Sequence, residues 1–205
     1  MSDAGNSPPR FRALVGSLRR ASLQPALPVY AAQLAPYGYE GGRDLLAFWA
    51  AQQELARALG SGLVTTADLG DLNDVHPLRK AQMGERFAAL ALNRSYGRRN
   101  LPATGPELKS VRFLPGGATL RFRCRGDLRT LDSASARGFA LAGADGAYRP
   151  ALAMPSGSGL RLTCQEVPQP LFMRHCWQVG AEPNLSDDSG IPAIPFTTQH
   201  STAGR

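Results

Sequence analysis

The chain has 205 residues, of which 43% are hydrophobic and 19% charged, as is typical of a globular protein with one large or two small domains. Its net charge of +7 is spread evenly, at +4 for residues 1–104 and +3 for residues 105–205, so no concentrated basic surface for nucleic acid is predicted. No apolar stretch approaches the roughly 20 residues of a transmembrane helix. The first ten residues lack the basic and then apolar pattern of a signal peptide.

The first hundred residues alternate helical and strand-like patterns. Three segments have apolar residues at helical spacing, and two short apolar runs between them are typical of buried strands. In chain order these segments are residues 11–18, 27–35, 45–59, 63–67 and 83–91. Pro77 suits the first turn of the third helix, because its missing N–H would be unpaired there anyway. The alternation predicts a parallel sheet covered by helices. Because two strands are too few for a complete sheet of this kind, we expect only part of an α/β domain.

A polar, proline-bearing stretch at residues 98–106 is a predicted linker, and beyond it the apolar period changes to two. Several short strands separated by turn signals predict an antiparallel β-sandwich. These predicted strands are residues 111–113, 118–124, 138–142, 160–164 and 171–177. The fold class is therefore a partial α/β domain over residues 1–100, followed by an all-β sandwich domain over residues 101–205 with an irregular tail.

His76 lies in the polar loop between the second predicted strand and the third predicted helix. In open α/β sheets, functional groups gather in loops at the carboxyl ends of strands. A histidine there can accept a proton from a hydroxyl nucleophile, and a nearby carboxylate would orient its ring. Asp74 is the nearest carboxylate, and Asp71 and Asp68 are alternatives. The competing interpretation is that these acidic residues only form turns and that His76 merely precedes a helix.

The block Asp68-Leu-Gly-Asp-Leu-Asn-Asp-Val-His-Pro77, followed by Gly84-Glu-Arg86, resembles the histidine-bearing block of bacterial sialate O-acetylesterases, which are α/β hydrolases of the SGNH type. Further matches in the family's order lie at residues 27–35, 96–97, 142–146, 177, 182–185 and 190–196. The resemblance covers nearly the whole chain. It implies hydrolysis of O-acetyl esters on sialic acid or a related sugar, with His76 as general base, Asp74 as its orienting acid, and no cofactor or metal.

The family's serine nucleophile lies in an early Gly-x-Ser-Asn block, which this sequence lacks. Ser17 follows a glycine inside a helical pattern, and Ser158 lies in the β region. Residues 2–6 resemble the end of a family block that supplies an oxyanion-hole asparagine, but Asp3 stands at that position, and an ionised carboxylate donates no N–H. We therefore expect a carboxyl-terminal fragment that is inactive alone, with exposed sheet edges open to self-association. Family members are often secreted or periplasmic, and the sequence leaves the compartment open.

The alternative to an esterase is a non-catalytic protein whose sandwich binds carbohydrate or a partner. Trp177 and Tyr148 are the residues that could stack on a sugar, although a core role for Trp177 is the simpler interpretation.

Two smaller features complete the candidates. The cysteines Cys124, Cys164 and Cys176 lack CxxC spacing, and both one disulfide with a free thiol and three buried thiols fit the sequence. His175-Cys176 beside Cys164 is a weak metal or thiol candidate, and His200 lies in the tail.

Overall fold

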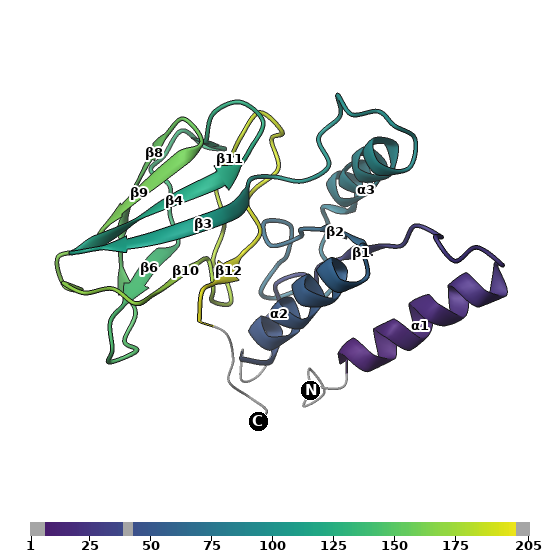
Figure 1. The fold of residues 1–205 in the computed structure, drawn as a ribbon, viewed down its shortest axis with the longest axis horizontal. Coiled ribbons are helices and arrows are strands. Elements are labelled where there is room, and N and C mark those ends of the chain that lie inside the picture. The colour runs from purple at the N-terminus through teal and green to yellow at the C-terminus, as the bar shows by residue number, and fades with distance from the viewer. Residues whose placement is uncertain (1–6, 39–42, 200–205) are drawn as a thin grey trace. The chain divides into compact units, whose positions relative to one another are not determined.

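The computed structural model describes residues 7–38 and 43–199. The chain forms two compact units (Figure 1). The first, here called the α/β unit, comprises residues 1–103 and 178–180, and the second, the sandwich unit, comprises residues 104–177 and 181–205. Each unit has its own buried apolar core.

The α/β unit has the predicted order of helix, strand, helix, strand and helix. Its elements are α1 (Ser7–Ala21), β1 (Tyr30–Ala32), α2 (Arg43–Ala58), β2 (Gly62–Val64) and α3 (Lys80–Arg94). The two strands pair in parallel, with Tyr30 opposite Gly62 and Ala32 opposite Val64. Both strands are shorter than the apolar runs that predicted them. Among the described residues, no helix is long and apolar enough to cross a bilayer.

The core of the α/β unit is formed by apolar side chains from all three helices. Its most buried members are Val15, Leu45, Trp49 and Leu90. The indole Nε1–H of Trp49 donates to the carbonyl oxygen of Leu34 at 2.7 Å, so this large side chain buries its apolar rings without leaving its polar atom unpaired. The helical spacing of these residues in the sequence therefore marks the faces that are buried.

The third helix begins later than Pro77 predicts. The first helical residue is Lys80, and its backbone N–H is bonded to the carbonyl oxygen of Leu78 at 2.8 Å. Arg79 has φ −77° and ψ 45°, outside helical geometry, so the chain makes a further turn after Pro77 before the helix starts. The expectation that Pro77 occupies the first helical turn was wrong, and its effect is to lengthen the loop that carries His76.

The outer edge of β1 is covered by a side chain. The amide of Gln52, from α2, accepts the backbone N–H of Leu34 at 2.9 Å and donates to the carbonyl oxygen of Ala32 at 3.0 Å. These are the bonds that a neighbouring strand would otherwise make. The edge of this small sheet is therefore partly satisfied from within the unit.

The loops that follow β1 and β2 approach each other so closely that they require glycine. Gly38 donates its N–H to the carbonyl oxygen of Leu72 at 2.9 Å, and a Cβ on Gly38 would lie only 2.7 Å from that oxygen. A Cβ on Gly70 would collide with the carbonyl oxygen of Pro36. Because glycine alone lacks the clashing atom, these two positions hold the loops backbone against backbone.

The sandwich unit contains two four-stranded antiparallel sheets (Figure 1). The first sheet has the order β3-β4-β9-β8, and the second has the order β12-β10-β6-β7. The strands are β3 (Glu107–Leu114), β4 (Gly117–Arg123), β6 (Phe139–Ala142), β7 (Arg149–Pro150), β8 (Leu152–Ser156), β9 (Gly159–Thr163), β10 (Phe172–His175) and β12 (Phe196–Thr197). Two further short strands, β5 (Arg129–Thr130) and β11 (Leu185–Ser186), pair with each other in antiparallel orientation. The predicted antiparallel sandwich is confirmed.

The alternation of residues along β4 separates the core from the surface. Ala118, Leu120 and Phe122 are buried, whereas Arg121 and Arg123 point to the exposed side. The basic residues that alternate in the sequence are thus the outer face of a strand. Leu160, Leu162, Phe139, Leu141 and Met173 complete the core from the other central strands.

His175 is a fully buried residue in this core. Its ring stacks on Phe139 with centroids 4.4 Å apart and lies 5.3 Å from the ring of Phe196. Burial disfavours the charged imidazolium and lowers the pKa of His175 to about 4, with the backbone of Ile194 opposing the shift. His175 is therefore a neutral core residue at physiological pH.

We predict that Gly70→Ala lowers the free energy of unfolding by about 1–3 kcal/mol, because the added methyl group forces two backbone segments apart. Gly84→Ala is the matched control: it lies in α3, where an added Cβ meets no atom within 4 Å, so alanine should stabilise the helix by about 0.5–1 kcal/mol. Urea unfolding of both variants measures the difference. Equal effects would contradict the close approach of the two loops.

We also predict an acid-dependent loss of stability from His175. Its pKa is about 4 when folded and 6.5 when exposed, so the unfolded state binds more protons between these values. Stability should therefore fall as the pH is lowered from 6.5 to about 4, by on the order of 3 kcal/mol from this residue.

The variant His175→Phe should remove that part of the pH dependence, because a phenyl ring between two aromatic neighbours carries no proton. Met173→Leu provides the control, because Met173 is another fully buried residue of this core and carries no titratable group, so this variant should keep the original pH dependence. Urea unfolding across this pH range measures both variants, and parallel curves for His175→Phe and the unchanged protein would show that His175 is not the titrating group.

Candidate active site

The loop after β2 is built from short turns that its acidic residues close. The carboxylate of Asp71 accepts the backbone N–H of Asn73 at 2.8 Å, and that of Asp74 accepts the backbone N–H of His76 at 2.7 Å. Such side chain to backbone bonds two residues apart are the usual turn chemistry of aspartate. The turn interpretation of Asp71 and Asp74 therefore describes their contacts in this structure.

His76 is exposed at the end of this loop, and its imidazole makes no hydrogen bond or ion pair with any described residue. The ring is accordingly open to an external group. Asp74 reaches His76 through the backbone and not through the ring, and only its Oδ1 is used in that contact. Within the described part of the chain, Oδ2 of Asp74 has no hydrogen-bond partner.

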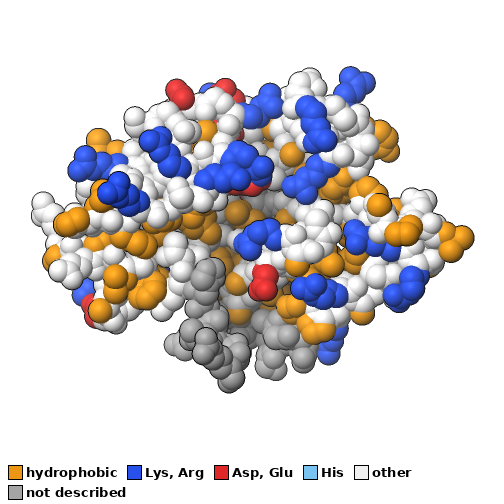
Figure 2. Space-filling model, viewed as in Figure 1, with side chains coloured by type: hydrophobic (Ala, Val, Ile, Leu, Met, Phe, Trp, Pro, Cys, Tyr) orange, Lys and Arg blue, Asp and Glu red, His pale blue; other side chains and the backbone are white. Residues whose placement is uncertain are grey.

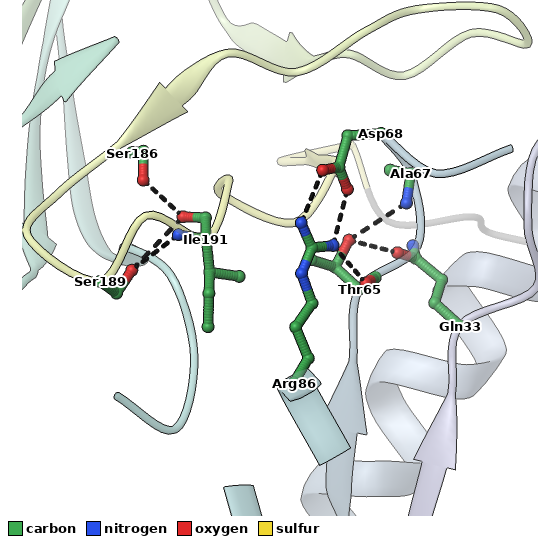
Figure 3. Close-up of polar contacts among 8 residues, drawn as sticks. All are labelled: Gln33, Thr65, Ala67, Asp68, Arg86, Ser186, Ser189 and Ile191. Carbon is green, nitrogen blue, oxygen red and sulfur yellow. Dashed lines mark hydrogen bonds and ion pairs between the residues drawn. The ribbon is translucent and has the colours of Figure 1, made fainter. Parts of the chain in front are cut away.

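Asp68 is committed to a different residue. The guanidinium of Arg86, from α3, donates from Nη1 to Oδ1 of Asp68 at 2.7 Å and from Nη2 to Oδ2 at 2.6 Å (Figure 3). Nη1 also donates to the carbonyl oxygen of Thr65 at 2.8 Å. The side chains of Arg86 and Asp68 are only 12% and 17% exposed, so the pair is shielded from solvent. Asp68 thus anchors the start of the loop instead of contacting His76.

A second set of buried polar residues lies at the carboxyl ends of the two strands. The hydroxyl of Thr65 donates to Oε1 of Gln33 at 2.9 Å, and the hydroxyl of Thr66 donates to the backbone oxygen of Gln33 at 2.7 Å (Figure 3 shows the first). Gln33 is 1% exposed, and its Nε2 has no acceptor among the described residues. These bonds tie the end of β1 to the start of the loop that leads to His76.

Sequence reasoning did not assign a role to Arg86 or Gln33. Gln33 is the polar residue in an otherwise apolar strand pattern, and such an interruption is a usable signal of a buried polar contact. Arg86 is part of the quoted Gly84-Glu-Arg86 segment, but its partner lies 18 residues away. Only the fold brings the two together.

The remaining sequence candidates do not form a site in the described residues. Asp3 and His200 lie outside the described residues. The ring of Tyr148 is covered on one face by the guanidinium of Arg174, whose Cζ is 4.3 Å from the ring centroid, and its hydroxyl donates to Gln199 at 3.1 Å. Trp177 is half-buried. At most one face of Tyr148 is open to a sugar.

The cysteines are free thiols, and Cys164 and Cys176 are buried. Burial raises the pKa of Cys176 to about 12, with the charge of Arg137 opposing the shift, and its sulfur lies 3.6 Å from Nε2 of the neutral His175. Burial, followed by the charges of Asp187 and Asp127, also raises the pKa of Cys124. The thiols of Cys124 and Cys176 are therefore poor nucleophiles. No group of three or more metal-binding side chains is found in the described residues.

The sandwich unit carries an open hollow of about 520 Å³. It is lined by Arg129, Thr130, Ser133, Ala134, Ser135, Ala136, Ala153, Met154 and Pro155. No aromatic side chain is among the described residues that line it, so it lacks the stacking surface of a typical sugar-binding site. Lys and Arg side chains lie at separate places across the face shown in Figure 2.

Comparison with known proteins shows a similarity to a solved structure. No family model matches the sequence, and no curated protein matches it. The crystal structure of a carbohydrate acetylesterase from Xanthomonas citri matches 97% of this chain with a TM-score of 0.89 and 26% sequence identity. The match covers 47% of the acetylesterase, so this chain spans about half the length of that protein. The chain is therefore similar in fold to part of a carbohydrate acetylesterase, which supports the carbohydrate-esterase part of the resemblance seen in the sequence.

Proposed function

We propose that this chain is the histidine-bearing part of a carbohydrate O-acetylesterase whose substrate is an O-acetylated sialic acid or a related sugar. The observation that carries this proposal is the fold similarity over 97% of the chain to a carbohydrate acetylesterase. The loop after β2 adds the chemistry, because it presents an exposed imidazole beyond the carboxyl end of a parallel strand. The sialate preference rests on the sequence resemblance alone.

In the proposed reaction a serine hydroxyl attacks the acetyl carbonyl and the sugar oxygen leaves. His76 accepts the serine proton and then delivers it to the leaving sugar oxygen, and water hydrolyses the acetyl-serine by the same route in reverse. The sequence has no Gly-x-Ser-Asn block. The match leaves about half of the acetylesterase uncovered. We propose that the nucleophilic serine is supplied by a segment that corresponds to this uncovered half.

Asp74 is proposed to orient the ring of His76. The turn that it closes keeps its carboxylate beside His76, with Oδ1 on the backbone N–H at 2.7 Å. We propose that Nδ1–H of His76 donates to Oδ2 of Asp74 in the active enzyme, where this bond would fix the ring tautomer and stabilise the imidazolium. Asp71 closes an equivalent turn on Asn73 and not on the histidine.

For the 205-residue chain alone we expect no esterase activity, since loss of the nucleophile in a serine hydrolase costs on the order of 10⁶ in turnover. The measurement is acetate release from an O-acetylated sialoside by the purified chain, beside a His76→Ala control. A labelled fluorophosphonate, which reacts with an activated serine, should not label the chain. Acetate release above the control would show that a nucleophile is present after all.

A chimaera tests the catalytic assignment directly, with this chain replacing the matched part of the Xanthomonas citri acetylesterase. We expect acetate release from acetylated sugars, a loss of about 10²–10⁴-fold in kcat for His76→Ala, and a loss of at least about tenfold for Asp74→Asn. The assay compares an O-acetylated sialoside with an acetylated neutral sugar, and faster hydrolysis of the sialoside is the expected order.

Asp71→Asn is the matched control in this chimaera, because it alters the same kind of turn without touching His76. It should keep kcat within about twofold of the unmodified chimaera, as is usual for exposed substitutions. Equal losses for Asp71→Asn and Asp74→Asn would remove Asp74 from the mechanism. An active chimaera that tolerates His76→Ala would remove His76.

No contact among the described residues of the sandwich unit favours the alternative function, which is glycan binding without hydrolysis. One face of Tyr148 is occupied by Arg174, and the open hollow lacks an aromatic wall. If the chimaera bound a glycan but did not hydrolyse it, that result would support this alternative.

A further inference from the structure

We infer that Arg86 is a positioning residue for the loop that carries His76. This inference rests on the proposed function for its catalytic meaning, but its structural content stands on the contacts of the α/β unit. Arg86 lies within α3, six residues after that helix begins, and it reaches back across the loop to the end of β2. Its guanidinium therefore joins the two ends of the segment that contains His76.

The guanidinium makes three hydrogen bonds, and each fixes a different atom at the start of the loop. Two parallel bonds hold both carboxylate oxygens of Asp68, and the third holds the carbonyl oxygen of Thr65 (Figure 3). A two-point contact between a planar guanidinium and a carboxylate restricts orientation as well as distance. With both side chains largely buried, the contact is also little weakened by water.

Further hydrogen bonds hold the loop between the Arg86–Asp68 pair and His76. Thr65 is bonded in turn to Gln33, and Leu69 donates its N–H to the carbonyl oxygen of Thr66 at 2.9 Å. Farther along, the carbonyl oxygen of Leu72 accepts the N–H of Gly38. The loop is thus fixed at its start by Arg86 and in its middle by Gly38, and the turn of Asp74 begins two residues after Leu72. Loosening the first anchor should loosen the position of His76.

The substitution Arg86→Lys tests this inference, because lysine keeps the positive charge but cannot make the two-point contact. Arg94→Lys is the matched control: Arg94 lies on the same helix and donates to the carbonyl oxygen of Ser61 at 3.2 Å, next to the opposite end of β2. Asp68→Asn is a second variant that removes one side of the contact if Arg86→Lys does not fold.

Amide hydrogen exchange in the 205-residue chain is the first measurement. The amides of Leu69 and Gly38 report on the loop, and those of Gln33 and Gly62, which bond to Val64 and Val29, report on the sheet. In Arg86→Lys we expect exchange at Leu69 and Gly38 to rise about tenfold while the sheet amides stay unchanged. Arg94→Lys should leave Leu69 and Gly38 as they are. Equal acceleration of loop and sheet amides, or none, would overturn the inference.

The chimaera supplies the catalytic measurement. A positioning residue should lower kcat by about tenfold and leave KM nearly unchanged, because the loop holds a proton acceptor and not the sugar. Arg94→Lys should leave both values unchanged. A chimaera without any activity would contradict the proposed function, and the exchange experiment would still decide whether Arg86 positions the loop. An active chimaera in which Arg86→Lys changes KM alone would contradict the positioning role.

Discussion

Three hydrogen bonds from the guanidinium of Arg86 determine where the polar loop of the α/β unit begins. A carboxylate and a guanidinium leave water at a high cost, which they recover only with good geometry and satisfied neighbours. The pair between Arg86 and Asp68 meets both conditions, since the carbonyl oxygen of Thr65 takes a further N–H. Removing either charge would leave the other buried and unpaired. The contacts of Arg86 thus link the helix, the strand end and the loop.

The contacts of Asp74 also bring together two interpretations that looked like competitors. A turn-forming aspartate and an aspartate that orients a histidine use different oxygens of one carboxylate. Here Oδ1 closes the turn on the backbone N–H of His76, and Oδ2 has no partner among the described residues. The role of Asp74 as a turn former is thus a structural fact, and its role as an orienting acid stays a proposal that the same geometry permits.

Helices and strands could be predicted from the sequence where their buried residues recur at a regular spacing. The three helices and the sandwich strands β4, β9 and β10 follow such a period, and all lie close to their expected positions. Strand β6 was also expected as a short apolar run, and all four of its residues are buried. Strands of two residues, such as β5 and β11, contain no period to detect. Strand β8 was missed because its exposed apolar residues and Pro155 hide the alternation.

The candidate site could be predicted only in part, because most of its bonds join residues far apart in the chain. His76 and Asp74 are neighbours, so a local pattern could draw attention to them. Gln33 and Thr65 are separated by 32 positions, and the contact of Arg86 with Asp68 spans 18. Without the fold, nothing in the sequence says that these side chains meet.

The amide of Gln52 gives the edge of β1 a property that the strand alone would lack. Since it already bonds Leu34 and Ala32, a foreign strand that pairs there must first displace this side chain. Association at this edge would thus exchange one set of hydrogen bonds for another. Its net free energy would be only the difference between the bonds to the new strand and those to the Gln52 amide. A single glutamine in this way discourages weak, non-specific pairing while leaving the edge accessible to a strand that fits the whole unit.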